Sequence, residues 1–196
     1  METSTIHKDT TVAKKKGLPA ALWALTISAF AIGTTEFVIV GLLSTVASDL
    51  GTSLTSAGLL VSLYAIGVAI GAPILTALTG KIPRKQLLMG IMLLFIIGNG
   101  LAAISPSFEL LLLSRVVTGF AHGVFFSIGS TIAASLVPKD KRATAISIMF
   151  AGLTVAIVTG VPLGTYIGQN FGWRATFVGV ALLGLVGAIA SLALVP

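Results

Sequence analysis

The sequence predicts an all-α membrane protein in which six transmembrane helices form one bundle. Hydrophobic residues make up 56% of the 196-residue chain and charged residues only 9%, whereas soluble domains carry about 25% charged residues. Apolar runs of about 20 residues, the length that crosses a bilayer, alternate with short polar hinges. Because lipid satisfies no backbone amide, each run is predicted to be a helix. The chain has no cysteine, which excludes disulfides, thiolate metal sites and cysteine nucleophiles.

The chain divides into a polar tail and a helical bundle. Residues 1–17 are rich in threonine and lysine and are predicted to form a disordered cytoplasmic tail. Residues 18–196 are predicted to form the bundle. The first apolar run is longer than the hydrophobic region of a signal peptide, about 7–15 residues, so we expect it to be retained as a span. The spans are expected at 18–46, 54–79, 87–104, 110–137, 143–168 and 175–195.

The basic residues gather in alternate hinges. The tail and the hinges after the second and fourth spans hold ten of the twelve lysines and arginines: Lys8, Lys14, Lys15, Lys16, Lys81, Arg84, Lys85, Lys139, Lys141 and Arg142. The other hinges carry Asp49, Glu109 and Arg174. The positive-inside rule therefore predicts a multi-pass protein of the cell (inner or plasma) membrane with both termini cytoplasmic. Since the charge reports orientation, no nucleic-acid partner is expected. Trp23 and Trp173, near span ends, are expected to anchor at the interfaces.

A short motif recurs in two spans. Gly71-Ala72-Pro73 of the second span matches Gly160-Val161-Pro162 of the fifth, and Thr76 then aligns with Thr165. These two spans run in opposite directions, so the match is that of two inverted three-helix repeats, which build many secondary transporters. Chance explains the recurrence equally well, because the motif is short and glycine is abundant.

Ionisable residues within spans indicate function, because a charge at mid-bilayer costs about 3 kcal/mol or more. Glu36 lies about 15 Å from the outer end of the first span, and Arg115 about 8–10 Å from that end of the fourth. The two are expected to meet if these spans are neighbours. Glu36 is interpreted as a proton carrier, balanced between apolar surroundings and a nearby guanidinium. The alternative is a fixed Glu36–Arg115 pair that only joins two helices. His122 either relays protons or bonds a backbone carbonyl.

Other span residues suggest contact with a solute and helix motion. Tyr64, Asn99 and Thr154 are polar candidates for the substrate path. Small residues recur every fourth position in the second, fourth and fifth spans: Gly67, Gly71, Gly119, Gly123, Gly152, Ala156, Gly160, Gly164 and Gly168. Such faces permit close approach and sliding of helices, or static packing alone. Pro73 and Pro162 each predict a kink.

Four motifs give the chain a family resemblance. They are Gly33-Thr34-Thr35-Glu36-Phe37, Leu111-x-x-x-Arg115-x-x-x-Gly119, Gly160-Val161-Pro162-Leu163-Gly164-Thr165-Tyr166 and Gly172-Trp173-Arg174-x-x-Phe177. The chain resembles the N-terminal half of a major facilitator superfamily transporter, in the drug:proton antiporter branch of arabinose-efflux-permease-like proteins. The resemblance implies that Arg115 belongs to a span-four motif linked to proton coupling. It also implies that Gly160, Pro162 and Gly164 form a span-five antiporter motif, and that Glu36 matches an acidic position in span one.

The chain departs from this family in two places. The loop between spans two and three, Thr79-Gly80-Lys81-Ile82-Pro83-Arg84-Lys85, keeps the bases of the family's cytoplasmic gate but lacks its aspartate. Gly80, Arg84 and Lys85 are the gate residues that the resemblance implies. The chain also stops after six spans, where such transporters continue. We therefore expect a partner: a missing C-terminal six-span half or a second half-size chain.

The predicted function is secondary active transport across the lipid bilayer, namely proton-coupled export of a small organic solute such as a drug. The proton gradient takes the place of a cofactor, and no metal is expected. Sugar or nucleoside efflux by the same mechanism is an alternative. A non-transporting interaction protein or inactive remnant is another, in which neutralising Glu36 alters stability but no flux. An enzyme is not expected, because the sequence shows no phosphate loop, metal-ligand spacing or nucleophile–base arrangement.

Overall fold

The computed structural model describes residues 18–78 and 82–196, apart from the side chains of residues 75–78. The predicted tail (1–17) and Gly80 of the predicted gate lie outside these residues. In the described part of the chain all regular secondary structure is helical, and six helical segments are long and apolar enough to cross a membrane. The predicted all-α, six-span fold class is therefore confirmed, and the chain is a multi-pass membrane protein.

Two of the six spans change helix type along their length. The first comprises α1 (Ala20–Val38), a 3-10 turn (Ile39–Leu42) and α2 (Leu43–Asp49). The fifth comprises a 3-10 turn (Lys139–Lys141), α7 (Arg142–Val155), a π-helical turn (Ala156–Gly160) and α8 (Val161–Phe171). The π-helical turn ends two residues before Pro162. Proline lacks an N–H and its ring crowds the carbonyl four residues earlier, and the wider turn accommodates both effects.

The other four spans are simpler. They comprise α3 (Leu54–Ala57) with α4 (Leu59–Leu78), α5 (Arg84–Ala103), α6 (Phe108–Ser135) and α9 (Trp173–Leu194). Serine caps begin α3 and α6, because the Ser53 and Ser107 hydroxyls each accept a backbone N–H from three residues on. Gly172 joins α8 to α9 with a φ of 88°, a left-handed conformation that glycine adopts without strain.

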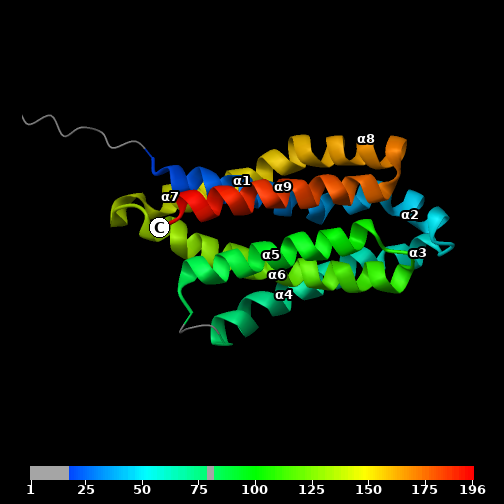
Figure 1. Ribbon diagram of the computed structural model, residues 1–196, viewed down its shortest axis with the longest axis horizontal. Coiled ribbons are helices and arrows are strands. Elements are labelled where there is room, and N and C mark those ends of the chain that lie inside the picture. The colour runs from blue at the N-terminus through cyan, green and yellow to red at the C-terminus, as the bar shows by residue number, and fades with distance from the viewer. Residues whose placement is uncertain (1–17, 79–81) are drawn as a thin grey trace, which may run out of the picture.

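The helices lie side by side along the long axis of the molecule (Figure 1). The beginnings of α5 and α7 and the end of α9 lie at one end, whereas α2 and α3 lie at the other. We call the first the basic end, because α5 begins there with Arg84 and Lys85 and α7 with Arg142. The opposite end carries Asp49 and Trp173.

The packing of the spans has an internal symmetry. The first span packs against the fifth and sixth, the fourth packs against the second and third, and the third packs against the sixth. Exchanging spans one, two and three for four, five and six leaves this pattern unchanged. The arrangement therefore matches two inverted three-helix repeats.

Glycines permit the closest of these contacts. A Cβ at Gly119 or Gly123 of α6 would collide with the backbone carbonyl of Tyr64 or Val68 of α4. In the fifth span, a Cβ at Gly152 would collide with the carbonyl of Thr26 in α1. The small-residue faces predicted from the sequence thus lie at helix contacts and bring backbones together.

A polar layer crosses the bundle between two apolar clusters. The larger cluster, towards the basic end, includes Leu25, Phe95 and Phe125. The smaller cluster, towards the opposite end, includes Leu42 and Phe177. The buried polar residues of the intervening layer are Thr34, Thr35, Asn99, Ser114, Arg115, Thr118 and, at its edge, His122. This layer contains the candidate site.

Candidate functional site

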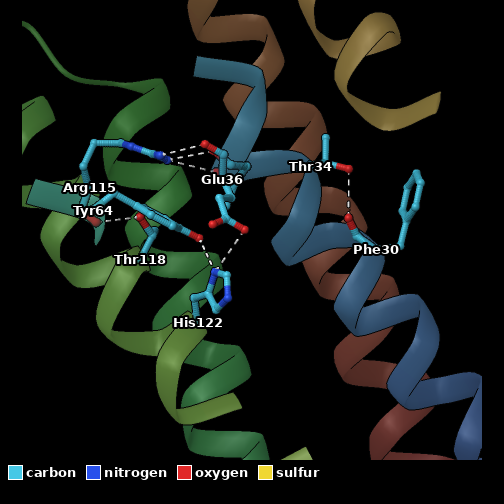
Figure 2. Close-up of polar contacts among 8 residues, drawn as sticks. Phe30, Thr34, Glu36, Tyr64, Arg115, Thr118 and His122 are labelled. Carbon is cyan, nitrogen blue, oxygen red and sulfur yellow. Dashed lines mark hydrogen bonds and ion pairs between the residues drawn. The ribbon is translucent and has the colours of Figure 1, made fainter. Parts of the chain in front are cut away.

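The Arg115 guanidinium is buried and bound by backbone carbonyls. Its Nη1 donates to the Thr35 carbonyl at 3.0 Å, its Nε to the Leu60 carbonyl at 3.3 Å and its Nη2 to the Glu36 carbonyl at 3.5 Å. The guanidinium carbon also lies 4.1 Å from the centroid of the Tyr64 ring (Figure 2). One arginine of α6 therefore joins the first and second spans, and the ring adds a cation–π contact.

This arrangement differs from the fixed Glu36–Arg115 pair considered from the sequence. In the described residues, the Glu36 carboxyl group lies 3.7 Å from His122 Nδ1, and Arg115 contacts Glu36 through the backbone oxygen. The break in the first span explains the difference. At Ile39 the α-helix changes to a 3-10 turn, and the Ile39 N–H is directed to the Phe37 carbonyl. The carbonyl of Thr35 is thereby available to the guanidinium.

His122 lies between Tyr64 and Glu36. Its Nδ1 is 2.9 Å from the Tyr64 hydroxyl oxygen and 3.7 Å from Glu36 Oε2 (Figure 2). The Glu36 side chain is 26% exposed and that of His122 10%. The structure thus brings Glu36 and Arg115 together, as their depths in the spans predicted, and adds His122 and Tyr64. The neighbours of Nδ1 are therefore two side chains, and not the backbone carbonyl that the alternative interpretation expected.

Asn99 lies behind the first span rather than on an accessible surface. Its Oδ1 accepts a 2.6 Å hydrogen bond from the Thr35 hydroxyl, and its Nδ2 donates to the Phe95 carbonyl at 2.9 Å. Asn99 is fully buried. In this conformation Asn99 therefore faces the interior of the bundle, because the rotation of α5, which polarity does not reveal, turns the amide inward; its place on a substrate path stays a prediction.

Tyr64 and Thr154, the other predicted path residues, lie in different surroundings. Tyr64 is buried at 2% exposure within the Glu36–His122 cluster, so its hydroxyl faces a protein partner rather than an open path. Thr154 is exposed on α7, one turn after Phe150. Thr154 alone of the three predicted path residues is accessible in this conformation.

An aromatic row extends the site from α6 to α7. The His122 ring lies 4.8 Å from that of Phe126, which lies 4.8 Å from that of Phe150. The row ends on the helix face that carries Thr154. The sequence reading missed both phenylalanines, because an aromatic residue in an apolar span has the same pattern as core packing.

The span-five motif packs against the first span at the level of Glu36. A Cβ at Gly160 would collide with the Thr34 hydroxyl, and one at Gly164 would lie 2.8 Å from Val38. The Thr34 hydroxyl itself donates to the Phe30 carbonyl at 2.8 Å (Figure 2). Pro162 is exposed. The motif therefore contacts the face of the first span that is turned away from the Glu36 side chain.

The remaining predicted residues lie at the basic end. Arg84 and Lys85 form the first turn of α5, with Arg84 exposed. They are distant in sequence and in the fold from the polar layer, at the end where α7 also begins. In the described part of the chain, no three His, Asp or Glu side chains gather to hold a metal ion.

The opposite end holds a second polar cluster that the sequence did not reveal. The Asp49 carboxylate accepts from Arg174 Nη1 at 2.6 Å and from Trp173 Nε1 at 3.0 Å. Arg174 Nη2 also donates to the Ser105 carbonyl at 2.7 Å. Trp173 is buried at 2% exposure, so it is not the interfacial anchor that its position near a span end suggested. The cluster therefore joins the hinges that follow the first, third and fifth spans.

Comparison with known proteins adds the family context. The model of the Major Facilitator Superfamily matches residues 25–196. The chain is 60% identical over 186 residues to the MFS-type transporter YtbD of Bacillus subtilis, covering 95% of this chain and 47% of YtbD. It is 40% identical over 179 residues to a chloramphenicol resistance protein of Streptomyces lividans, covering 91% of this chain and 46% of that protein. The chain spans about half the length of the curated relatives it matches.

The fold itself is shared with a solved transporter. A crystal structure of the peptide transporter POT in complex with sulfate superposes with a TM-score of 0.79 at 18% identity, covering 89% of this chain and 37% of that chain. At this identity the likeness concerns the fold alone. The family resemblance expected from the four motifs is confirmed by the family match.

Proposed function

Because this chain belongs to the Major Facilitator Superfamily, we propose that it supplies one half of a proton-coupled exporter of small organic solutes, such as a drug. The observation that carries the proposal is Glu36, an acidic side chain in the polar layer. It is partly exposed, beside a buried arginine and a buried histidine. Acidic residues within spans are costly and are retained chiefly in ion and proton pathways.

The surroundings of Glu36 suit reversible protonation. Its 26% exposure gives water access to the carboxyl group, whereas full burial would prevent exchange. The Arg115 charge is bound to the carbonyls of Thr35 and Leu60, so it stays in place whether Glu36 is charged or neutral. A fixed positive charge favours the carboxylate and the apolar clusters favour the neutral acid. These opposing influences allow the proton to be both bound and released.

In the proposed cycle, the proton and the solute alternate. With the site open to the outside, Glu36 accepts a proton as the solute leaves. With the site open to the cytoplasm, the proton is released as a new solute binds. The basic end is the cytoplasmic end under the positive-inside rule, which places both termini in the cytoplasm of a cell or inner membrane. The proton gradient supplies the driving force.

A second six-helix unit is the proposed partner. Alternating access requires one bundle to rock against another around a site near the midplane. The second and fifth spans are the most exposed of the six, which supports their contact with further protein or lipid. The partner is a C-terminal half or another half-size chain.

The resistance to chloramphenicol named for one relative supports a drug as the solute. The exposed Thr154 and the aromatic row of Phe126 and Phe150 offer a polar contact and stacking surface to an amphiphile. Efflux of a sugar or nucleoside is the alternative. It would use the same proton chemistry, so it differs from drug efflux only in the solute that is carried.

Efflux from a pump-deficient bacterium tests the proposal. The chain is expressed alone and with a second six-span half, as the parent, as Glu36→Gln and as the matched control Glu109→Gln, which alters an exposed acid of the α6 first turn. We expect efflux of dye or chloramphenicol that a protonophore and Glu36→Gln abolish and Glu109→Gln retains, at equal surface expression. Efflux that survives Glu36→Gln with its protonophore sensitivity intact contradicts the assignment of Glu36.

A further inference from the structure

A single nitrogen of His122 faces two polar side chains from two different helices. Nδ1 lies 2.9 Å from the hydroxyl oxygen of Tyr64 on α4 and 3.7 Å from Oε2 of Glu36 on α1 (Figure 2). A neutral imidazole carries its proton on one of two nitrogens, and the hydrogen bonds of the other decide which. The tautomer of His122 therefore depends on whether Nδ1 accepts a hydrogen bond from Tyr64 or donates one to Glu36.

Tyr64 requires an acceptor in this geometry. The residue is 2% exposed, and a buried hydroxyl left without a partner is costly. In the described part of the chain, the partner of this hydroxyl is His122 Nδ1. If the hydroxyl donates, Nδ1 is unprotonated and the imidazole proton resides on Nε2.

An unprotonated Nδ1 is favoured by one charge state of Glu36 over the other. Beside a neutral carboxyl group, the nitrogen lone pair meets no negative charge. Beside an ionised carboxylate at 3.7 Å, the same lone pair is repelled, whereas a proton on Nδ1 is attracted. Nδ1 cannot accept from Tyr64 and donate to Glu36 at once.

We propose that the tautomer of His122 follows the charge of Glu36 and thereby controls the hydrogen bond of Tyr64. The inference rests on the proposed function, in which Glu36 gains and loses a proton. With Glu36 neutral, the Tyr64 hydroxyl donates to Nδ1 and Nε2 carries the proton. With Glu36 ionised, its own proton leaves to water, and the imidazole proton moves by exchange with water from Nε2 to Nδ1. The imidazole stays neutral, and Tyr64 loses its acceptor.

Tyr64 is therefore a positioning residue that acts on the second span. Its ring lies 4.1 Å from the Arg115 guanidinium carbon, and its backbone carbonyl abuts Gly119 of α6. The groups that face or influence His122 are the Glu36 carboxyl group from α1, the Tyr64 hydroxyl from α4 and the fixed charge of Arg115, two turns away on α6 itself. The hydrogen bond between the Tyr64 hydroxyl and His122 thus joins α4 to α6 beside their close backbone contact at Gly119.

Nitrogen NMR of His122 tests the proposal on the full 196-residue chain in lipid bilayers. The chain has two histidines, so a His7→Gln background leaves His122 as the only ¹⁵N-histidine signal. Protonated and unprotonated ring nitrogens give well-separated resonances. The parent, Glu36→Gln and Tyr64→Phe are compared through a pH titration. Tyr166→Phe is the matched control, because it removes the other tyrosine hydroxyl at an exposed site.

We expect the parent to convert from the Nε2–H to the Nδ1–H tautomer as Glu36 ionises, and Glu36→Gln to keep Nε2–H throughout. Tyr64→Phe, which keeps the ring over Arg115, is expected to raise the ratio of Nδ1–H to Nε2–H about fivefold, the effect of one ordinary hydrogen bond. Tyr166→Phe is expected to leave the ratio unchanged. An Nδ1–H tautomer in Glu36→Gln, or a ratio unmoved by Tyr64→Phe, overturns the proposal.

The outcome is separable from that of the proposed function. A tautomer that follows Glu36 while efflux ignores Glu36→Gln supports this inference and contradicts transport through Glu36. If the tautomer never changes while Glu36→Gln abolishes efflux, this inference is contradicted and transport through Glu36 is supported. If Tyr64→Phe fails to fold, the parent and Glu36→Gln decide the question alone.

Discussion

Arg115 donates a 3.0 Å hydrogen bond to the backbone carbonyl of Thr35, the residue immediately before Glu36. The guanidinium thus lies beside the acidic residue without depending on its charge. A carboxylate partner would be lost on protonation, whereas a carbonyl remains an acceptor in every protonation state. A change of charge on Glu36 would therefore leave this attachment intact.

Replacing Arg115 with lysine tests this attachment. Arg115→Lys keeps the charge but cannot reach the carbonyls of both Thr35 and Leu60 with one ammonium group. We expect a loss of about 2 kcal/mol in the free energy of unfolding, the value of one hydrogen bond to a charged group. Thermal unfolding in detergent measures it, with the exposed Arg142→Lys as the control. Equal melting temperatures for the parent and Arg115→Lys are incompatible with the attachment.

Thr35 and Asn99 are expected to be energetically coupled. Their side chains share a buried 2.6 Å hydrogen bond, so each single change removes one partner of this bond and leaves the other buried group without it. Thr35→Val, Asn99→Leu and the double variant form a double-mutant cycle. We expect a coupling of about 1 kcal/mol in unfolding free energy. Strictly additive effects mean that the two side chains act independently.

Close helix packing at Gly119 predicts a strong effect of one methyl group. Gly119→Ala drives a Cβ into the carbonyl of Tyr64, a backbone atom that cannot rotate away. The expected loss is about 1–3 kcal/mol in unfolding free energy. Gly100 is the matched control, because a Cβ there meets nothing within 4 Å. Gly100→Ala is expected to be neutral or to stabilise α5 by up to about 1 kcal/mol. Equal effects at both glycines refute the close-contact explanation.

The cluster at the opposite end predicts unequal effects of its two charges. The Asp49–Arg174 pair is more than a third exposed on both sides and contributes less than about 1 kcal/mol by itself. Arg174→Gln also removes the donors to the Ser105 carbonyl. We expect it to lower the unfolding free energy by about 1 kcal/mol more than Asp49→Asn does. Denaturant titration of the two variants compares them, and a larger effect of Asp49→Asn contradicts the structural assignment.

The fold class was predictable from the sequence because it depends on averages over about 20 residues. Apolar length and charge placement define the six spans, and inversion of the repeat follows because its copies are offset by three spans, an odd number. The meeting of Glu36 and Arg115 was predictable in part, since depth along a helix depends only on residue count.

The partners within the site were not predictable in the same way. Backbone carbonyls exist at every residue, so no sequence signal marks that of Thr35 as the acceptor for Arg115. The rotation of α5, which turns Asn99 inward, and that of α4, which places Tyr64 beside His122, result from packing among several helices. Trp173 was wrongly predicted to anchor at the membrane interface. The turn at Gly172 instead folds it against Asp49, and a contact between such distant hinges has no local sequence signal.

Solute-driven proton movement in proteoliposomes tests the role of Glu36 most directly. Vesicles containing the chain and a second six-span half, with a pH-sensitive dye inside, are given an outward solute gradient and compared with vesicles of Glu36→Gln and Glu109→Gln. The account predicts that the solute gradient drives protons in the opposite direction in the parent and in Glu109→Gln, and drives none in Glu36→Gln. Proton movement of parental size in Glu36→Gln would contradict it.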